Sequence, residues 1–178
     1  MTRCSTSPVS GFDSRAQNQS EFYPAPESRH TISSISIIGL GNMARALADR
    51  ALAGGNAVEI IGRDPAKTKE VAAALGGAAT AGTFGTTPAG DLVILAVPYA
   101  SALPVVAQYG DALAGKVIID ISNTSSADVT GLVIPDGTSG AQEIAKAVPA
   151  SAYVVKAFNT VFGHILAQGG SLGVNLSD

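Results

Sequence analysis

The stretch Ser36-Ile37-Ile38-Gly39-Leu40-Gly41-Asn42-Met43-Ala44 decides the fold. An apolar run with strand character leads into Gly-x-Gly-x-x-Ala and then into a segment with helical periodicity. This order of strand, glycine turn and helix is typical of a dinucleotide-binding βαβ unit. Gly39 permits the tight turn, Gly41 has no Cβ to block a diphosphate, and Ala44 allows close packing of helix on strand. A glycine-rich turn without a ligand is the alternative, and the flanking pattern argues against it.

Outward from this turn, short β-branched runs alternate with alanine-rich helical stretches. The alternation predicts one α/β domain with a Rossmann-type, doubly wound, mainly parallel sheet. The strands read as apolar throughout, as expected when helices cover both faces. Predicted strands span residues 34–39, 57–61, 78–81, 92–97, 116–121 and 153–158, the third being weak. Predicted helices span residues 42–53, 65–75, 102–109, 141–147 and 161–167.

Composition excludes several classes of function. The chain has 178 residues, of which 46% are hydrophobic and 14% charged, which suits one soluble domain. A net charge of -3 leaves no basic surface for nucleic acid. Cys4 is the single cysteine, and His30 and His164 form no cluster with metal-ligand spacing, so we expect neither an internal disulfide nor a metal site. No apolar stretch approaches the ~20 residues that span a membrane, and we expect a cytoplasmic protein.

Residues 1–30 differ in composition from the rest, being rich in Ser and Pro without an apolar run. This composition predicts a disordered N-terminal tail, with residues 31–178 forming the Rossmann domain that contains the glycine turn. The tail also lacks the apolar core of a signal peptide. A partner-binding arm is the alternative interpretation of this segment.

The end of the second predicted strand indicates which dinucleotide binds. An NAD site usually places an acidic residue there, about 20 residues after the glycine motif, to bind the ribose 2′-hydroxyl. This chain has Gly62 and Arg63 instead, followed by Lys67 one helical turn later. Gly62 leaves room, while Arg63 can clamp a 2′-phosphate and Lys67 adds a second positive charge. Asp64 could instead bind the ribose hydroxyls, but before Pro65 it reads as a helix N-cap. The pattern favours NADP over NAD. An ordinary charged surface loop is the alternative.

Four segments together resemble the NADPH-dependent oxidoreductases of the deazaflavin coenzyme F420. The same segments are similar to the cytosolic domain of six-transmembrane metalloreductases, which pass hydride from NADPH to a flavin. The resemblance covers about residues 34–169, and it rests on Ile37–Ala44, Gly62–Lys67, Ala96-Val97-Pro98-Tyr99 and Val154-Val155-Lys156-Ala157-Phe158-Asn159-Thr160.

The resemblance implies a role for each matching position. The diphosphate would be held by Gly39, Leu40, Gly41, Asn42 and Met43. The 2′-phosphate would be held by Arg63 and Lys67 beside Gly62, and the nicotinamide ring would lie against Val97 and Pro98. The pocket for a flat acceptor would be lined by Asn159, Thr160 and Val161. Two alternatives stay open. Asn159 and Thr160 could serve only as a cap of the last helix, and Asn123 could either cap a helix or contact the cofactor.

The sequence offers no convincing proton donor. His164 falls in the middle of a predicted helix, and Lys156 reads as a partly buried structural lysine. Hydride transfer between stacked rings needs mainly close, parallel placement of the two rings. We therefore expect an oxidoreductase that moves hydride between NADP(H) and coenzyme F420 or a flavin, with no catalytic side chain and no metal.

A non-catalytic NADP-binding module or a truncated remnant is the second interpretation. The resembling reductases continue with a further strand and helices, whereas this sequence ends in a glycine-rich stretch at residues 169–178. Truncation of the family's C-terminal elements would remove part of the acceptor pocket or of a dimer interface. A homodimer is one arrangement compatible with the sequence. No motif identifies the electron acceptor.

Overall fold

The computed structural model describes residues 34–125, 131 and 133–168. The tail predicted at residues 1–30 lies outside the described residues. Within the described part, no helix is long and apolar enough to cross a membrane.

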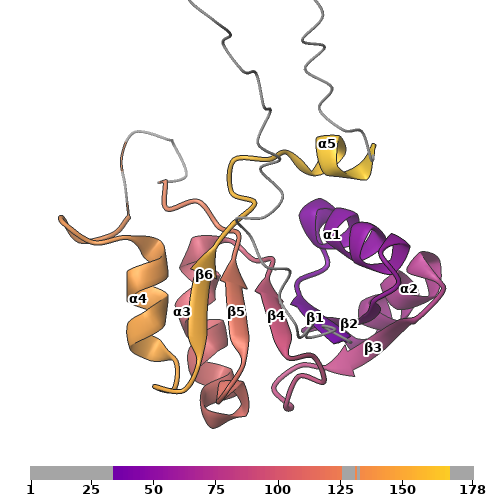
Figure 1. Ribbon diagram of the computed structural model, residues 1–178, viewed down its shortest axis with the longest axis horizontal. Helices are drawn as coiled ribbons and strands as arrows, with labels where there is room; N and C mark the ends of the chain where they lie inside the picture. Colours follow the sequence, from indigo (N-terminus) through magenta and orange to yellow (C-terminus); the bar gives the residue numbers. More distant parts are fainter. Residues whose placement is uncertain (1–33, 126–130, 132, 169–178) are drawn as a thin grey trace, which may run out of the picture. The chain divides into compact units, whose positions relative to one another are not determined.

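Six parallel strands form one sheet in the order β3-β2-β1-β4-β5-β6 (Figure 1). The order reverses between β1 and β4, which is the topological switch point of a doubly wound sheet. The predicted Rossmann-type fold is therefore confirmed. The strands are β1 (Ser34–Ile38), β2 (Ala57–Gly62), β3 (Ala79–Thr83), β4 (Leu92–Leu95), β5 (Val117–Asp120) and β6 (Tyr153–Lys156).

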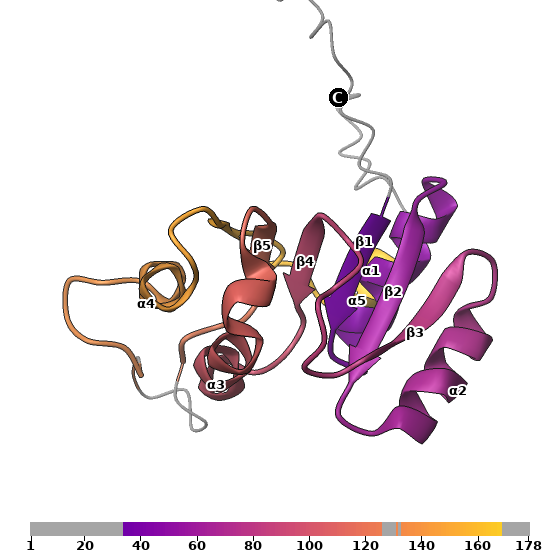
Figure 2. The ribbon, with the colours of Figure 1, turned by 90° about the horizontal axis from the view of Figure 1, so that it is seen from below.

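Helices cover the two faces of the sheet in two groups. From below, α3 and α4 lie beside the β4–β5 half of the sheet, and α2 lies beside β3 (Figure 2). A 3-10 helix at Gly110–Leu113 extends α3. The helices are α1 (Asn42–Ala53), α2 (Pro65–Leu75), α3 (Tyr99–Tyr109), α4 (Gly140–Ala147) and α5 (Gly163–Ala167).

Two hydrophobic clusters lie on opposite faces of the sheet. Because successive side chains of a strand point to opposite faces, β1 sends Ile37 into one cluster and Ile38 into the other. The Ile37 cluster includes Leu47 of α1 and Val71 of α2, whereas the Ile38 cluster includes Val105 of α3. This double coverage explains the apolar strands from which the sheet was predicted.

Polar residues lie within several strands, so the expectation of strands that are apolar throughout is wrong: β1 contains Ser36, β2 contains Glu59, and β5 and β6 end at Asp120 and Lys156. Ser36 is completely buried, and its hydroxyl donates to Glu59 Oε2 at 2.5 Å while accepting from the backbone N–H of Gly90 at 2.9 Å. The same Glu59 oxygen accepts from the N–H of Ala89 at 2.9 Å. The connection from β3 to β4 is thus fixed by hydrogen bonds across the strands.

Most predicted boundaries agree with the structure, and the differences have local causes. Helices α1 and α2 begin and end as predicted, and the side chain of Asp64 caps α2 by accepting from the N–H groups of Ala66 and Lys67. Helix α3 begins at Tyr99, three residues before the predicted start, directly after Pro98 with its helix-compatible φ of -57°.

The last strand and the last helix are both shorter than predicted. Strand β6 ends at Lys156, and Phe158 has a φ of 60°, which no strand residue adopts. Helix α5 begins at Gly163 after the N-cap Phe162, without a side-chain cap. The alternative that Asn159 and Thr160 cap this helix is therefore wrong.

We predict that Ser36→Ala destabilises the domain by about 1–3 kcal/mol, because the buried N–H of Gly90 loses its acceptor. Chemical denaturation of both proteins measures the change. The matched control is Ser34→Ala, since the Ser34 hydroxyl makes an exposed, longer bond of 3.4 Å to the Ala89 carbonyl oxygen. Equal stability of the Ser36 variant and the wild type would contradict a structural role for this hydrogen bond.

Candidate functional site

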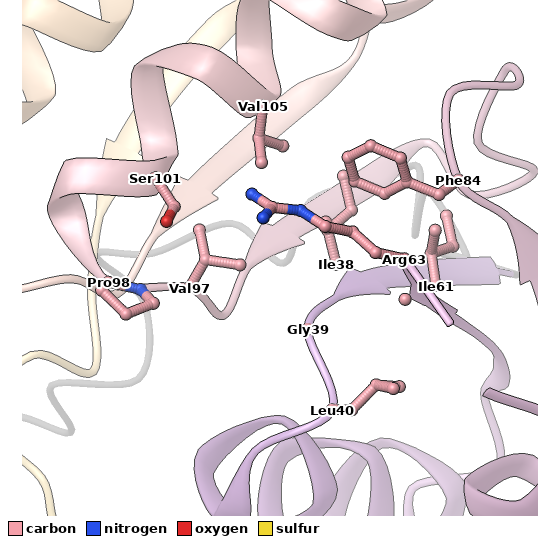
Figure 3. A pocket seen from close by; sticks show the side chains of 11 residues that line it. Ile38, Gly39, Leu40, Ile61, Arg63, Phe84, Val97, Pro98, Ser101 and Val105 are labelled. Carbon is pink, nitrogen blue, oxygen red and sulfur yellow. The ribbon is translucent and has the colours of Figure 1, made fainter. Parts of the chain in front are cut away.

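A cavity of about 240 Å³ lies at the switch point of the sheet, beside the carboxyl ends of β1, β2 and β4 (Figure 3). Six of the residues predicted from the sequence to bind a cofactor line it: Gly39, Leu40, Gly62, Arg63, Val97 and Pro98. In open α/β sheets, ligands bind at this crevice. The remaining lining residues are Ile38, Ile61, Phe84, Ser101 and Val105.

Gly39 lies where the ends of β1 and β4 approach each other. Its φ is 135°, and a Cβ built on it would lie 2.2 Å from the carbonyl oxygen of Ala96. Its N–H donates to the carbonyl oxygen of Ile61, and the N–H of Ala96 donates to the carbonyl oxygen of Ile38, both at 2.9 Å. Only glycine fits between these strand ends.

Gly41 has a different reason to be glycine. It is the N-cap of α1, with ordinary extended angles (φ -75°, ψ 178°), and a Cβ built on it would meet no atom within 4 Å. The first turn of α1 contains no acidic residue. The space that a Gly41 side chain would occupy is therefore open, whereas Gly163 lies beside the following residues, with a Cβ built on it 3.5 Å from the Met43 nitrogen. The N–H groups of Gly41, Asn42 and Met43 begin a helix whose dipole favours an anion.

The reason given from the sequence for Gly62 needs correction. A Cβ on Gly62 would lie 2.6 Å from Leu40 Cδ1 and 2.8 Å from Thr68 Oγ1. The room that Gly62 provides is thus filled by side chains of the chain itself. Gly62 lets the turn after β1 pack directly against the end of β2.

Arg63 reaches across the cavity. Its guanidinium carbon lies 5.9 Å from the centre of the Phe84 ring, within the range of a cation–π contact. The guanidinium group points toward Val105 and Ser101 (Figure 3). Lys67 does not line this cavity; its side chain is exposed on the first turn of α2.

Phe84 and Ser101 were missed in the sequence analysis. Phe84 follows β3, which the sequence predicts only weakly and ends two residues early, so the next loop was not connected with the carboxyl edge of the sheet. Its ring packs edge to face on Tyr109 with centroids 5.6 Å apart. Ser101 fell before the predicted start of its helix, although the Pro98–Tyr99 step is a recognisable start signal.

The predicted acceptor residues form a separate group beside β5 and β6. The Asn123 Nδ2 atom donates to the Asn159 carbonyl oxygen at 3.2 Å, and Asn159 Nδ2 donates to Asn123 Oδ1 at 3.4 Å. Thr160 is exposed and Val161 is half-buried. None of Asn159, Thr160 and Val161 lines the cavity at the switch point, and neither do Gly41, Asn42 and Met43.

Two ionisable residues flank this group. The Lys156 side chain is 31% exposed, and its ammonium lies 2.7 Å from Asp120 Oδ2. Nearby, burial raises the pKa of Tyr99, and the negative charges of Glu143 and Asp120 add to that shift. The Tyr99 phenol is therefore neutral at physiological pH.

His164 lies away from the cavity, in the first turn of α5 and not in the middle of a helix as predicted. It stacks on the exposed ring of Phe162 with centroids 5.7 Å apart. It also lines a second hollow of about 280 Å³ between α1 and α5, together with Asn42, Arg45 and Asp49. Among the residues that the structure describes, no group of three His, Cys, Asp or Glu side chains is placed to hold a metal.

Comparisons with known proteins agree with this geometry. The family model described as "NADP oxidoreductase coenzyme F420-dependent" matches residues 34–124, about half of the chain. No curated protein matches the sequence.

Solved structures extend the similarity beyond the matched segment. A hypothetical protein from Sinorhizobium meliloti is 32% identical with a TM-score of 0.66, the similarity covering 76% of this chain and 65% of that one. A protein from Arthrobacter sp. FB24, proposed to be an F420-dependent NADP reductase, is 25% identical with a TM-score of 0.64, covering 74% and 64%.

A more distant structure shares the fold alone. The pyrroline-5-carboxylate reductase of Coxiella burnetii is 20% identical with a TM-score of 0.51, covering 70% of this chain and 43% of that one.

The chain spans slightly less than two thirds of the length of the Sinorhizobium and Arthrobacter proteins. The family match nevertheless includes the glycine turn, Arg63 and the loop after β4, which are the parts that meet at the cavity. The chain therefore belongs to the family of coenzyme F420-dependent NADP oxidoreductases.

Proposed function

We propose that this protein binds NADP(H) at the switch-point cavity and transfers hydride between it and a deazaflavin or flavin-type acceptor. One observation carries the proposal. The cavity is lined by Arg63 and by Gly39 and Leu40, the two residues that lead directly into the start of α1 at Gly41. An NADP molecule bound there would have its diphosphate near the start of α1 and its 2′-phosphate near Arg63.

The diphosphate would lie in front of α1. Gly41 leaves open space there, and the N–H groups of Gly41, Asn42 and Met43 would donate to the phosphate oxygens. Gly39 and Leu40 would form the wall of the turn. No acidic side chain in the first turn of α1 opposes this charge.

The 2′-phosphate would be bound by Arg63. Its planar guanidinium can donate two parallel hydrogen bonds to a phosphate, and the position offers no carboxylate for the 2′-hydroxyl of NAD. Lys67 is exposed one helical turn further on and would add a second positive charge. Gly62, packed under Leu40, would keep the end of β2 close to this site.

The nicotinamide ring would lie against Val97 and Pro98, which follow β4. The acceptor would stack on it near Asn159, Thr160 and Val161, at the next loops along the sheet. Bound NADPH supplies the hydride, and the role of this chain is to hold two rings face to face and keep water out. Among the described residues that line the cavity, Arg63 and Ser101 are the polar side chains, and neither is a usual proton donor.

The first functional prediction concerns the choice of cofactor. Arg63→Ala should weaken NADPH binding about ten- to a hundredfold, the scale of a charge-assisted hydrogen bond, and leave NADH binding nearly unchanged. Calorimetric titration of both nucleotides measures this. Arg50→Ala is the control, because Arg50 lies in the last turn of α1, away from the crevice. Equal losses for NADPH and NADH would rule out this role for Arg63.

The second prediction concerns the glycine turn. Gly41→Val should abolish binding of either dinucleotide and leave the fold intact, because its extended angles suit a β-branched residue and its surroundings are open. Gly39→Val is the contrasting variant, and it should destabilise the domain because its Cβ would overlap the Ala96 carbonyl. Circular dichroism and calorimetry separate the two effects. Retained dinucleotide affinity in Gly41→Val would show that this turn does not hold the diphosphate.

The third prediction concerns the chemistry. His164→Ala should keep turnover within a few-fold of the wild type, well short of the ~10²–10⁴-fold contribution of a general acid. Replacing both Asn159 and Thr160 by Leu should obstruct the acceptor and slow its reduction while NADPH still binds. Stopped-flow oxidation of NADPH with coenzyme F420 and with FMN measures both variants.

Two results would contradict the proposed chemistry. A hundredfold loss in the His164 variant, with folding and NADPH affinity unchanged, would indicate a side-chain acid. Absence of turnover with either acceptor in the wild type, with NADPH still bound, would instead favour a non-catalytic NADP-binding module.

A further inference from the structure

An ion pair between a buried carboxylate and a partly exposed ammonium joins the carboxyl ends of β5 and β6. Lys156 Nζ lies 2.7 Å from Asp120 Oδ2 and also donates to the carbonyl oxygen of Ser122. The other oxygen of Asp120 accepts from the N–H and the hydroxyl of Ser122, at 2.9 and 2.7 Å. Asp120 is completely buried, whereas the Lys156 side chain is 31% exposed. Each carboxylate oxygen therefore has a donor, and the ammonium binds both β5 and the turn after it.

Stability alone is a poor explanation for such a pair. Taking the Asp120 carboxylate out of water costs several kcal/mol, which its attraction to a partly exposed ammonium offsets only in part. The pair occupies the last paired position of the two strands, Asp120 opposite Lys156. Its location suggests that it fixes the geometry of the loops that leave the sheet there.

A second link joins the same two loops. The side chains of Asn123 and Asn159 bond across the gap between them, at 3.2 and 3.4 Å. Between the two links, Phe158 holds a φ of 60°, a conformation that costs a non-glycine residue free energy and persists only where its surroundings enforce it. We call residues 121–123 and 157–159 the β5–β6 platform.

We infer that the Asp120–Lys156 pair positions the β5–β6 platform for the nicotinamide half of NADP(H). This inference rests on the proposed function. With the adenosine half on the β2 side, beside Arg63, the nicotinamide half extends over the β4 side, where β5 and β6 are the next strands. Lys156 is then a positioning residue: it holds the loop of Asn123 and Asn159 in place and does not touch the cofactor itself.

Removal of the ammonium should disturb one half of the site only. In Lys156→Met, the buried Asp120 carboxyl group loses its cation, and the Ser122 carbonyl loses a donor. The platform would shift, while Arg63 and the turn at Gly41 lie on other strands. The protein should therefore lose affinity for NADPH but not for a ligand that carries only the adenosine with its 2′- and 5′-phosphates.

The experiment compares two ligands by calorimetry: NADPH, and adenosine 2′,5′-bisphosphate, which lacks the nicotinamide half. The control variant is Lys116→Met, because Lys116 Nζ also donates to a backbone carbonyl, that of Gly90 at 2.9 Å, but at the amino end of β5. We expect Lys156→Met to weaken NADPH binding by about tenfold or more and to leave bisphosphate binding within about twofold of wild type. Lys116→Met should change the affinity for neither ligand. Lys156→Arg keeps the positive charge and should retain part of the NADPH affinity that Lys156→Met loses.

The outcomes separate the two proposals. Equal losses for both ligands in Lys156→Met, or no loss for either, would overturn the positioning role while the NADP site stands. A wild-type protein that binds neither ligand would overturn the proposed function and this inference with it. If Lys156→Met does not fold, Asp120→Asn decides the question by the same titrations, since it keeps an oxygen and removes the charge that Lys156 neutralises.

Discussion

The close approach of Gly39 to the carbonyl oxygen of Ala96 is the constraint on which the rest of the site depends. A Cβ at residue 39 would lie 2.2 Å from that oxygen, so the ends of β1 and β4 can meet only because this residue is glycine. Their meeting brings the loops that carry Leu40, Val97 and Pro98 to one cavity. It also starts α1 two residues later, at Gly41, where the missing side chain leaves open space.

The sequence predicts this part of the fold well because its signals are local. The glycine turn, the amphipathic helix after it, and the Asp64–Pro65 helix start each fit within a few residues, and α1 and α2 have the predicted bounds. Contacts between distant residues were not predictable in the same way. Nothing in β1 or β2 indicated that Ser36 and Glu59 would bond to each other and to the loop before β4, since their partners are 23 and 54 residues away.

In the candidate site, too, the residues marked by local sequence signals were predicted, and those that depend on contacts between distant residues were not. The predicted residues that line the cavity lie at or just after the ends of strands that the sequence identifies, and the parallel direction of those strands brings their ends to one edge of the sheet. These residues are Gly39, Leu40, Gly62, Arg63, Val97 and Pro98. Phe84 was missed because the strand before it has weak character, and its contact with Arg63 is a tertiary one. Strand β6 ends earlier than the apolar pattern indicated, because Phe158 has a positive φ. No sequence pattern signals a positive φ in a large residue, so this end was not predicted.

Buried Ser36 has a consequence for how the strands find their alignment. A strand that is apolar on both faces specifies its register weakly, because a slip by one residue exchanges one isoleucine for another. In β1 such a slip would carry Ser36 into the cluster around Ile37 and leave its hydroxyl without Glu59 and without the N–H of Gly90. One hydroxyl thus makes the wrong alignments costly, in addition to its contribution to the stability of the native state. The same alignment sets Gly39 opposite Ala96, so a hydrogen bond in the middle of β1 favours the register on which the crevice at the carboxyl edge of the sheet depends.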